Sequence, residues 1–239
     1  MNGQLDPIAL MRKIGELESK IEALRTIQTG GQWIPARIPV YVSTTSVRFV
    51  GINLTSVFPV GTKIKCTQTT VKYFYVIAAA YSGGDTTLTL TGGSDYTVAD
   101  AAITEFAYSH AAVANGFPDW FNYVPTYGGS GSMTYTSVTT DYAKFKLDGI
   151  LLLLKLICTG TTGGTASHSI SATLPFERSV STVHVLSAST IQYGETVYKT
   201  GQCFTVSSTT IHVRRPNSEN WVLGASAKAA VSGTIGINF

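Results

Sequence analysis

The stretch DYAKFKLDGILLLLKLI, residues 141–157, decides the fold of this chain. Its first half alternates apolar residues with Lys144 and Lys146, which is the pattern of a β-strand that buries one face and exposes the other. Its second half, residues 150–157, is apolar almost without interruption, which indicates a strand covered on both faces. The stretch therefore predicts two consecutive strands. It is too short to span a bilayer, which takes about 20 residues.

The second of these strands also predicts self-association. In a two-sheet sandwich the fold itself covers only the inner face of each sheet, so the outer face of a fully apolar strand needs a neighbouring subunit. We expect Leu152 and Leu154 to lie in that contact between copies of the chain.

Composition extends the β prediction to most of the chain. Only 13% of the 239 residues are charged, against about 25% in ordinary globular proteins, and Thr, Ser and Gly take their place. Thr, Tyr, Phe and Val suit strands, and Gly supplies the turns between them. About eight short strands after residue 132 suggest a jelly-roll sandwich, and hairpins between residues 37 and 109 suggest a smaller β-domain.

The beginning of the chain differs from the rest, because its pattern is helical. Asp6 suits a helix N-cap, Pro7 the first helical position, and Gly30-Gly31 a helix end. The apolar residues follow a heptad repeat, and five of them would form the seam of a coiled coil: Leu10, Ile14, Leu17, Ile21 and Leu24. Ile at a positions with Leu at d positions favours a dimer. An amphipathic helix packed on its own domain is the alternative.

The predicted fold class is mainly β, with an N-terminal α-helical coiled coil followed by a small β-domain and a C-terminal jelly-roll-like β-sandwich. Four segments follow from it. Residues 1–31 form the coiled-coil helix for oligomerisation and attachment, and residues 32–114 form the small β-domain. Residues 115–131 form a neck rich in aromatic residues and glycine, and residues 132–239 form the sandwich. Its aromatic residues indicate that the neck packs against one or both domains.

Charge and cysteine content exclude several classes of partner. The formal net charge is +3, and six lysines sit singly in predicted strands: Lys63, Lys65, Lys72, Lys144, Lys146 and Lys155. Because nucleic-acid binding needs several phosphate contacts from one surface, we expect no nucleic-acid partner, and no apolar run is long enough for membrane insertion. Cys66, Cys158 and Cys203 lack metal-ligand spacing and are expected to be reduced thiols that serve as small apolar residues.

The sequence contains no motif for catalysis or for a cofactor. It has no GxSxG, HExxH, P-loop or GxGxxG pattern, and most acidic residues outside the predicted helix fall in turns or at the domain junction, where Asp has a local structural role. We therefore expect no catalytic residue, no cofactor and no metal, and we predict that the protein is not an enzyme. Two arrangements stay open because they would form only between subunits: histidines on a three-fold axis, and paired carboxylates that cleave a glycan.

Two loops in the C-terminal region offer the mixture of aromatic, amide and charged side chains that carbohydrate sites use. They cover residues 192–195 and 214–221 and contain six candidate ligand-binding residues: Tyr193, Glu195, Arg214, Asn217, Asn220 and Trp221. The competing interpretation is that Tyr193 and Trp221 are core or subunit-contact residues.

Two stretches resemble modules of bacteriophage tail-fibre and other virion appendage proteins. The first is VGTKIKCTQ…VKYFYVIAAAYSGGDTTLTLTGGSDYTVADAAIT…FPDWFNYVPT, from Val60 to Thr126, and the second is SMTYTSVTTDYAKFKLDGILLLLKLICTGTTGGTASHSISATLP, from Ser132 to Pro175. The resemblance implies a homotrimeric fibre with a β-rich tip that adsorbs to the host surface, in a virion assembled in the host cytoplasm. The trimer disagrees with the dimer that the heptad favours. The chain lacks the long shaft and large N-terminal anchor of many such proteins, so its N-terminal helix is expected to contact other virion proteins.

Three functions compete on this basis. The first is a homotrimeric tail fibre or spike that binds the host cell surface, with a surface glycan as the ligand. The second is a head or neck fibre or a capsid decoration protein with a purely structural role. The third is a depolymerase, which would release reducing ends from host glycan. Saturable binding to host cells separates the first from the second.

Overall fold

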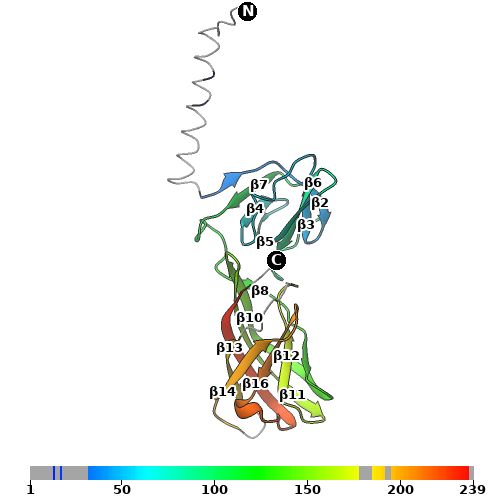
Figure 1. The fold of residues 1–239 in the computed structure, drawn as a ribbon, viewed down its shortest axis with the longest axis vertical. Helices are drawn as coiled ribbons and strands as arrows, with labels where there is room; N and C mark the ends of the chain where they lie inside the picture. Colours follow the sequence, from blue (N-terminus) through cyan, green and yellow to red (C-terminus); the bar gives the residue numbers. More distant parts are fainter. Residues whose placement is uncertain (1–12, 14–16, 18–31, 178–184, 192–194, 237–239) are drawn as a thin grey trace, which may run out of the picture.

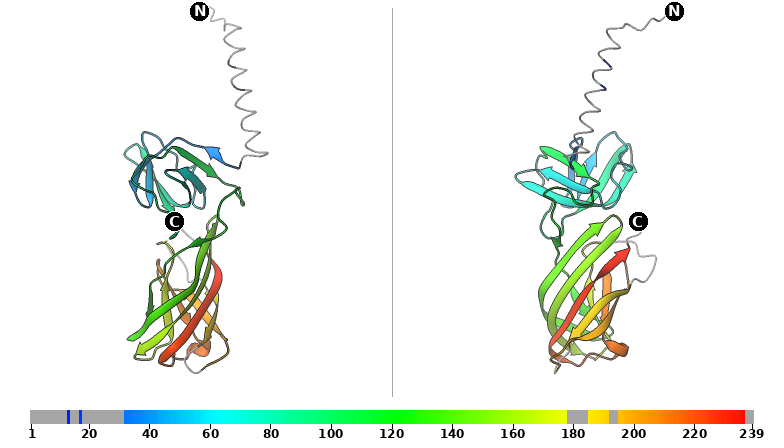
Figure 2. Two further views of the ribbon diagram at one scale, coloured as in Figure 1. Left: turned by 180° about the vertical axis from the view of Figure 1, so that it is seen from behind. Right: turned by 90° about the vertical axis from the view of Figure 1, so that its left-hand side faces the viewer.

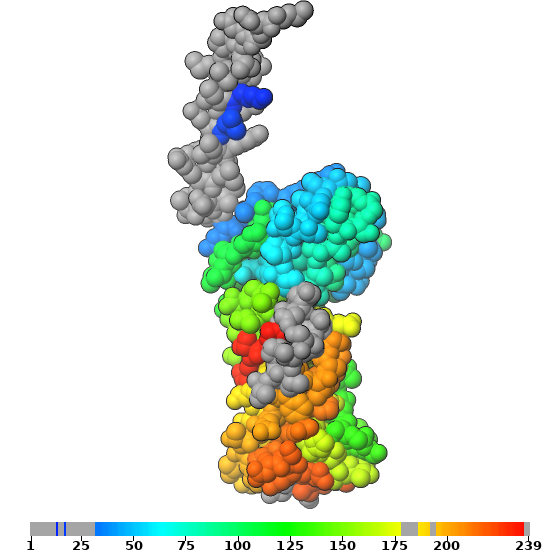
Figure 3. Space-filling view, in the orientation of Figure 1, coloured from blue at the N-terminus to red at the C-terminus, as the bar shows by residue number. Residues whose placement is uncertain are grey.

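The computed structural model describes Lys13, Leu17 and residues 32–177, 185–191 and 195–236. In this part the chain forms two antiparallel sheets, one in each of two domains that are stacked end to end (Figure 1). Figure 3 shows the same arrangement as two lobes, with the first sheet in one lobe and the second sheet in the other. We refer to them as the first domain and the second domain.

The first domain is a seven-stranded sheet in the order β1-β7-β4-β5-β6-β3-β2. Its strands are β1 (Ile34–Pro35), β2 (Val40–Ser43), β3 (Ser46–Phe49), β4 (Lys63–Thr67), β5 (Val71–Ser82), β6 (Asp85–Thr91) and β7 (Glu105–Ser109). Alternating apolar residues face one core, in which the rings of Phe49 and Phe58 stack with centroids 5.3 Å apart. Phe106 meets Phe49 edge-on, which is a favoured geometry for aromatic pairs.

The second domain is a nine-stranded sheet in the order β8-β10-β11-β16-β13-β14-β15-β12-β9. Its elements are β8 (Phe121–Asn122), β9 (Tyr127–Gly129), β10 (Met133–Asp148), β11 (Leu151–Gly164), β12 (Ser169–Thr173), β13 (Val185–Ile191), β14 (Lys199–Thr205), β15 (Thr210–Arg214), the 3-10 turn η1 (Pro216–Ser218) and β16 (Gly224–Gly236). The short strands β8 and β9 come from the segment for which the sequence predicts a neck.

The nine strands curl around a common core (Figure 2). Strand β9, at one end of the sheet, approaches β10, near the other end. The hydroxyl groups of Tyr127 in β9 and Thr140 in β10 lie 2.8 Å apart. Both layers of the core therefore belong to one curled sheet, which is compatible with the predicted β-sandwich.

Strand β11 corrects the prediction of a strand covered on both faces. Leu152 and Leu154 point into the core of their own chain and are 0% and 1% exposed, so they are not available to a second copy. The outward residues of β11 are less covered: Leu151 is 41% exposed, and Lys155 is exposed as well. The side chains of β11 alternate between the inner and the outer face, but the sequence does not show this because leucine occupies both faces of the strand.

The strand that is covered on both faces is β5. Phe74 and Val76 face the core of the first domain, whereas Tyr75 and Ile77 belong to the core of the second domain. The Tyr75 ring packs on Phe121 of β8, with centroids 5.4 Å apart. Burial raises the pKa of the Tyr75 hydroxyl to about 12. The neighbour that covers this strand is therefore the other domain of the same chain.

Polar contacts also join the two domains. One oxygen of the Asp95 carboxylate accepts a hydrogen bond from the backbone N–H of Asn122, and the other accepts one from its side-chain amide, both at 2.8 Å. The Ser94 N–H donates to the carbonyl oxygen of Asn122, also at 2.8 Å. Aromatic packing and these three hydrogen bonds make the junction between the domains a packed interface.

The predicted fold class is wrong about the helical coiled coil. The described residues are almost entirely strand and loop, and the one helical element among their segments is the turn η1. Residues 1–31, where the coiled coil is predicted, lie outside the described residues apart from Lys13 and Leu17. An apolar stripe becomes a coiled coil only when a partner helix covers it, and sequence periodicity does not supply that partner. No helix in the described part is long and apolar enough to cross a membrane.

The prediction of three reduced, apolar cysteines is confirmed. Cys66, Cys158 and Cys203 are buried and free. Burial raises the pKa of all three thiols, to about 11 for Cys66 and Cys158 and to about 12 for Cys203, so they stay protonated at neutral pH.

Candidate functional site

The loop between β15 and β16 lies at the end of the second domain that is distant from the first domain (Figure 1). It contains three of the sequence-predicted ligand-binding residues, Asn217, Asn220 and Trp221. The structure brings together a group of side chains there that we call the tip cluster: Glu195, Arg215, Glu219 and Trp221.

Arg215 is the centre of the tip cluster. Its side chain is 1% exposed, and Nη2 lies 3.0 Å from Glu195 Oε1 and 3.4 Å from Glu219 Oε2. Lys199 reaches the same Glu195 oxygen at 2.6 Å. The guanidinium carbon lies 6.0 Å from the centre of the Trp221 ring. Arg215 is the buried member of both ion pairs, whereas the side chains of Glu195 and Glu219 are 15% and 55% exposed, so the pairs tie the loop to a buried guanidinium.

Burial of Trp221 decides what the tip cluster can do. The Trp221 ring is 0% exposed, so it offers no face on which a sugar could stack. Within the described residues, Arg215 Nε and Nη1 and Trp221 Nε1 have no hydrogen-bond partner, and all three atoms are buried. The cluster therefore holds the loop from inside, and the exposed residues of the loop are Asn217, Ser218, Glu219, Asn220, Val222 and Leu223.

The other predicted ligand-binding residues do not join the tip cluster. Tyr193 lies outside the described residues. Arg214 points to the outer face of the sheet, where its guanidinium stacks on Phe204 at 4.3 Å and Nε donates to Ser169 Oγ at 3.4 Å. Beside it, burial lowers the pKa of His212 below 6.5, and the charge of Arg214 adds to this effect. The predicted residues thus divide between two faces of the domain.

The predicted oligomerisation residues fall into three groups in the structure. Four of them lie outside the described residues: Leu10, Ile14, Ile21 and Leu24. Leu17 is described and is 56% exposed. Leu152 and Leu154 are core residues, as shown above.

Lysine and aromatic side chains lie together on the outer face of β10 and β11 and in the segment before β8. We call this group the lysine patch: Trp120, Tyr142, Lys144, Lys146 and Lys155. The ammonium groups of Lys146 and Lys155 lie 5.2 Å and 4.8 Å from the centre of the Trp120 ring. That of Lys144 lies 5.1 Å from the Tyr142 ring. Such contacts contribute about 0.5–1 kcal/mol each at exposed sites.

Backbone pairing creates the lysine patch. Lys144 in β10 and Lys155 in β11 are direct cross-strand partners, and Lys146 follows on the same face of β10. Among the described residues no carboxylate lies within ion-pair distance of these three lysines. Like charges directly opposite each other on a sheet repel, so the patch is a basic surface without an internal counter-charge.

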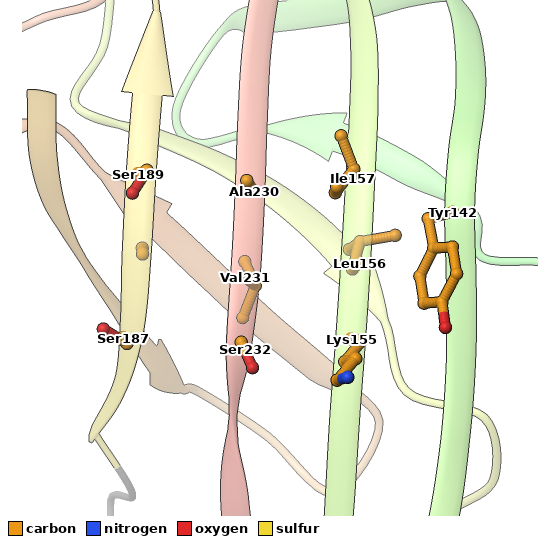
Figure 4. Close-up of a pocket in the computed structure, with 10 residues that line it drawn as sticks. Tyr142, Lys155, Leu156, Ile157, Ser187, Ser189, Ala230, Val231 and Ser232 are labelled. Carbon is orange, nitrogen blue, oxygen red and sulfur yellow. The ribbon is translucent and has the colours of Figure 1, made fainter. Parts of the chain in front are cut away.

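A shallow hollow of about 340 Å³ continues the lysine patch across the sheet (Figure 4). We call it the lateral trough. It arises because β13 and β16 carry small outward side chains, whereas β10 and β11 carry large ones. The side chains that matter for its chemistry are Tyr142, Lys155, Ile157, Ser187, Ser189 and Ser232. Figure 4 shows the serines on one side of the trough and Tyr142 on the other.

Sequence reasoning did not find the lysine patch. It placed Lys144 and Lys146 correctly on an outward face, but it treated the lysines as scattered because no two are adjacent in the sequence. The missing information is the register that sets Lys144 opposite Lys155. The hairpin through Gly149 was the available signal, because a short turn between two strands pairs the residues on either side of it.

The described residues form no cluster of metal ligands. They contain no group of three or more His, Cys, Asp or Glu side chains that could hold a metal ion. The lysine patch and the lateral trough can bind a ligand through charge, hydroxyl groups and aromatic rings.

Comparison with known proteins adds no assignment. No protein-family model matches the chain, and neither a curated protein nor a solved structure matches it significantly.

Proposed function

We propose that this chain is a structural protein of a bacteriophage particle, a homotrimeric tail fibre or spike that binds the host cell surface through its second domain. The resemblance of Val60–Thr126 and Ser132–Pro175 to virion appendage modules supports the phage assignment and the trimer. The proposal includes no catalytic step.

The observation that carries the proposal is the exposed loop at the distant end of the second domain. Arg215 and Trp221 hold this loop from inside, and the packed junction with the first domain prevents the second domain from swinging freely. A fibre that recognises a surface needs a firm connection between its attachment end and its binding end, because ordering a flexible connection would weaken binding.

A purely structural role, as a head or neck fibre or a capsid decoration protein, is the second candidate. Burial of Trp221 favours it, because the tip then lacks an exposed aromatic ring of the kind that carbohydrate sites use.

Binding of the purified, fluorescently labelled full chain to host cells tests the proposal. We expect saturable binding, competition with adsorption of the intact phage, and a light-scattering mass three times the 25.5 kDa of one chain. Asn217→Gly together with Asn220→Ala should leave the melting temperature nearly unchanged, because Gly tolerates the positive φ of +54° at position 217, and should reduce binding if the tip contacts the cell. Absence of saturable binding by an intact trimer would favour the structural role.

A further inference from the structure

We propose that the lysine patch and the lateral trough form one binding site for a surface glycopolymer whose sugar or polyol units are linked by phosphodiester groups. The inference rests on the proposed function, because it names the chemistry of the surface to which the second domain would bind. The site lies on the side of the domain, away from the tip cluster.

The first argument is unbalanced positive charge. Lys144, Lys146 and Lys155 lie side by side on one face, and no described carboxylate pairs with them. Asp119 and Asp148 line a neighbouring hollow together with Lys146, but neither carboxylate lies within ion-pair distance of its ammonium group. An anion that lies across the patch would relieve the repulsion between the lysines, so the free protein favours an anionic partner.

The second argument is the type of cation. All three charges are ammonium groups, which are compact point charges that bind phosphate well. The planar fork of Arg, which binds carboxylate and phosphate alike with two parallel hydrogen bonds, is absent from the patch. The patch therefore recognises an anion through charge alone, and the comparison with polygalacturonate below distinguishes a phosphodiester from a uronate.

The third argument is the chemistry between the charges. The hydroxyl groups of Ser187, Ser189 and Ser232 have no hydrogen bond to any described residue and are open to the trough. Tyr142 lies on β10, at the opposite edge of the trough from Ser187 and Ser189 of β13 (Figure 4). Sugars and polyols offer hydroxyl groups for the serines and an apolar edge for the ring, and the volume of about 340 Å³ lies in the range of small-ligand sites.

Two other occupants fit this surface less well. A second copy of the chain would have to bury three lysines without acidic partners, and lysine is depleted from protein interfaces for this reason. A nucleic acid would meet only three cations, whereas tight binding of duplex DNA uses about 6–10 phosphate contacts.

The test compares two sets of substitutions in the full chain. The first set is Lys144→Gln, Lys146→Gln and Lys155→Gln together, and the control set is Lys144→Arg, Lys146→Arg and Lys155→Arg, which keeps the charge at the same positions. Affinity is measured at low salt against poly(glycerol phosphate), with polygalacturonate, neutral dextran and a single-stranded oligonucleotide as comparison ligands. Thermal unfolding of each variant shows whether it is folded.

We expect poly(glycerol phosphate) to bind the unmodified chain more tightly than the other three ligands. The Gln set should weaken this binding about a hundredfold, since each lysine near an anionic surface contributes roughly a factor of five, and the Arg set should retain most of it. Rising salt should weaken binding of the unmodified chain much more steeply than that of the Gln set.

Three results would overturn the inference. Equal affinity of the Gln set and the unmodified chain would remove the lysine patch from the site. Tighter binding of polygalacturonate would contradict the phosphodiester, and tighter binding of the oligonucleotide would contradict the glycopolymer. Failure of the proposed function looks different: the polymer would still bind through the lysines, but the chain would not bind host cells. Conversely, cell binding that the Gln set leaves unchanged would overturn only the present inference.

Discussion

Single residues determine how closely the two domains approach. Gly93 in the first domain has a positive φ of +61°, and a Cβ atom there would overlap the carbonyl oxygen of Asn122 in β8. Gly83 in the hairpin between β5 and β6 has the same φ, but nothing lies within 4 Å of its potential Cβ position. Substituting each glycine by alanine therefore distinguishes the effect of backbone strain, which both positions share, from the effect of contact between the domains, which occurs only at Gly93.

Gly93→Ala should lower the free energy of unfolding by about 2–4 kcal/mol, because strain and overlap with the second domain add together. Gly83→Ala is the control and should cost about 1–2 kcal/mol, from strain alone. Urea unfolding of both variants checks the difference. Equal losses would mean that the domains do not contact each other at Gly93 in solution.

At the scale of the element, β11 combines two roles in one strand. Its inward residues, including Leu152 and Leu154, build the core of the second domain. Its outward residues include Lys155, which belongs to the lysine patch. Periodicity alone did not separate these faces, because leucine on the outer face resembles leucine on the inner face. The pairing of β11 with β10 and β16 separates them.

Leu154→Ala should lower the free energy of unfolding by about 2–5 kcal/mol, because it leaves a cavity in a closely packed core. Leu151→Ala, at a position on the outer face that is 41% exposed, should cost less than about 1 kcal/mol. Calorimetric or urea unfolding measures both. If Leu151→Ala were as costly as Leu154→Ala, another copy of the chain would have to cover the outer face.

In the whole molecule, the decisive feature is the junction between the sheets. Tyr75 and Ile77 of β5 enter the core of the second domain, although β5 belongs to the first sheet. Asp95 adds two hydrogen bonds to Asn122. Because the two cores share a strand, we expect the domains to unfold in one cooperative transition.

Asp95→Ala should weaken this coupling, because it removes both hydrogen bonds to Asn122, each of which involves a charged acceptor. We expect the single calorimetric transition to broaden or to separate into two, with a loss of about 1–3 kcal/mol in stability. Asp100→Ala is the matched control: Asp100 is exposed in the same domain, and the structure gives its carboxylate no hydrogen bond to a described residue. A single unchanged transition for Asp95→Ala would show that the aromatic packing alone couples the domains.

The candidate site could be predicted only in part. The loop containing Arg214 to Trp221 was identified from its residue types, but Trp221 is buried because it packs in the core of the second domain, which the loop sequence does not show. The lysine patch was not identified, since its members come from two strands and from the segment before β8. Residue type indicates what a side chain can bind, whereas the sheet register decides which side chains can bind together.

The sequence by itself determined the β character of the described domains, the position of β10 and β11, and the outward direction of Lys144 and Lys146, because alternation of apolar residues is a local property of a strand. Only the tertiary structure decided that one curled sheet forms the second domain, that β5 is the strand covered on both faces, and that three lysines share one surface. These features depend on hydrogen bonds and packing between residues distant in the sequence, and local periodicity contains no information about that pairing.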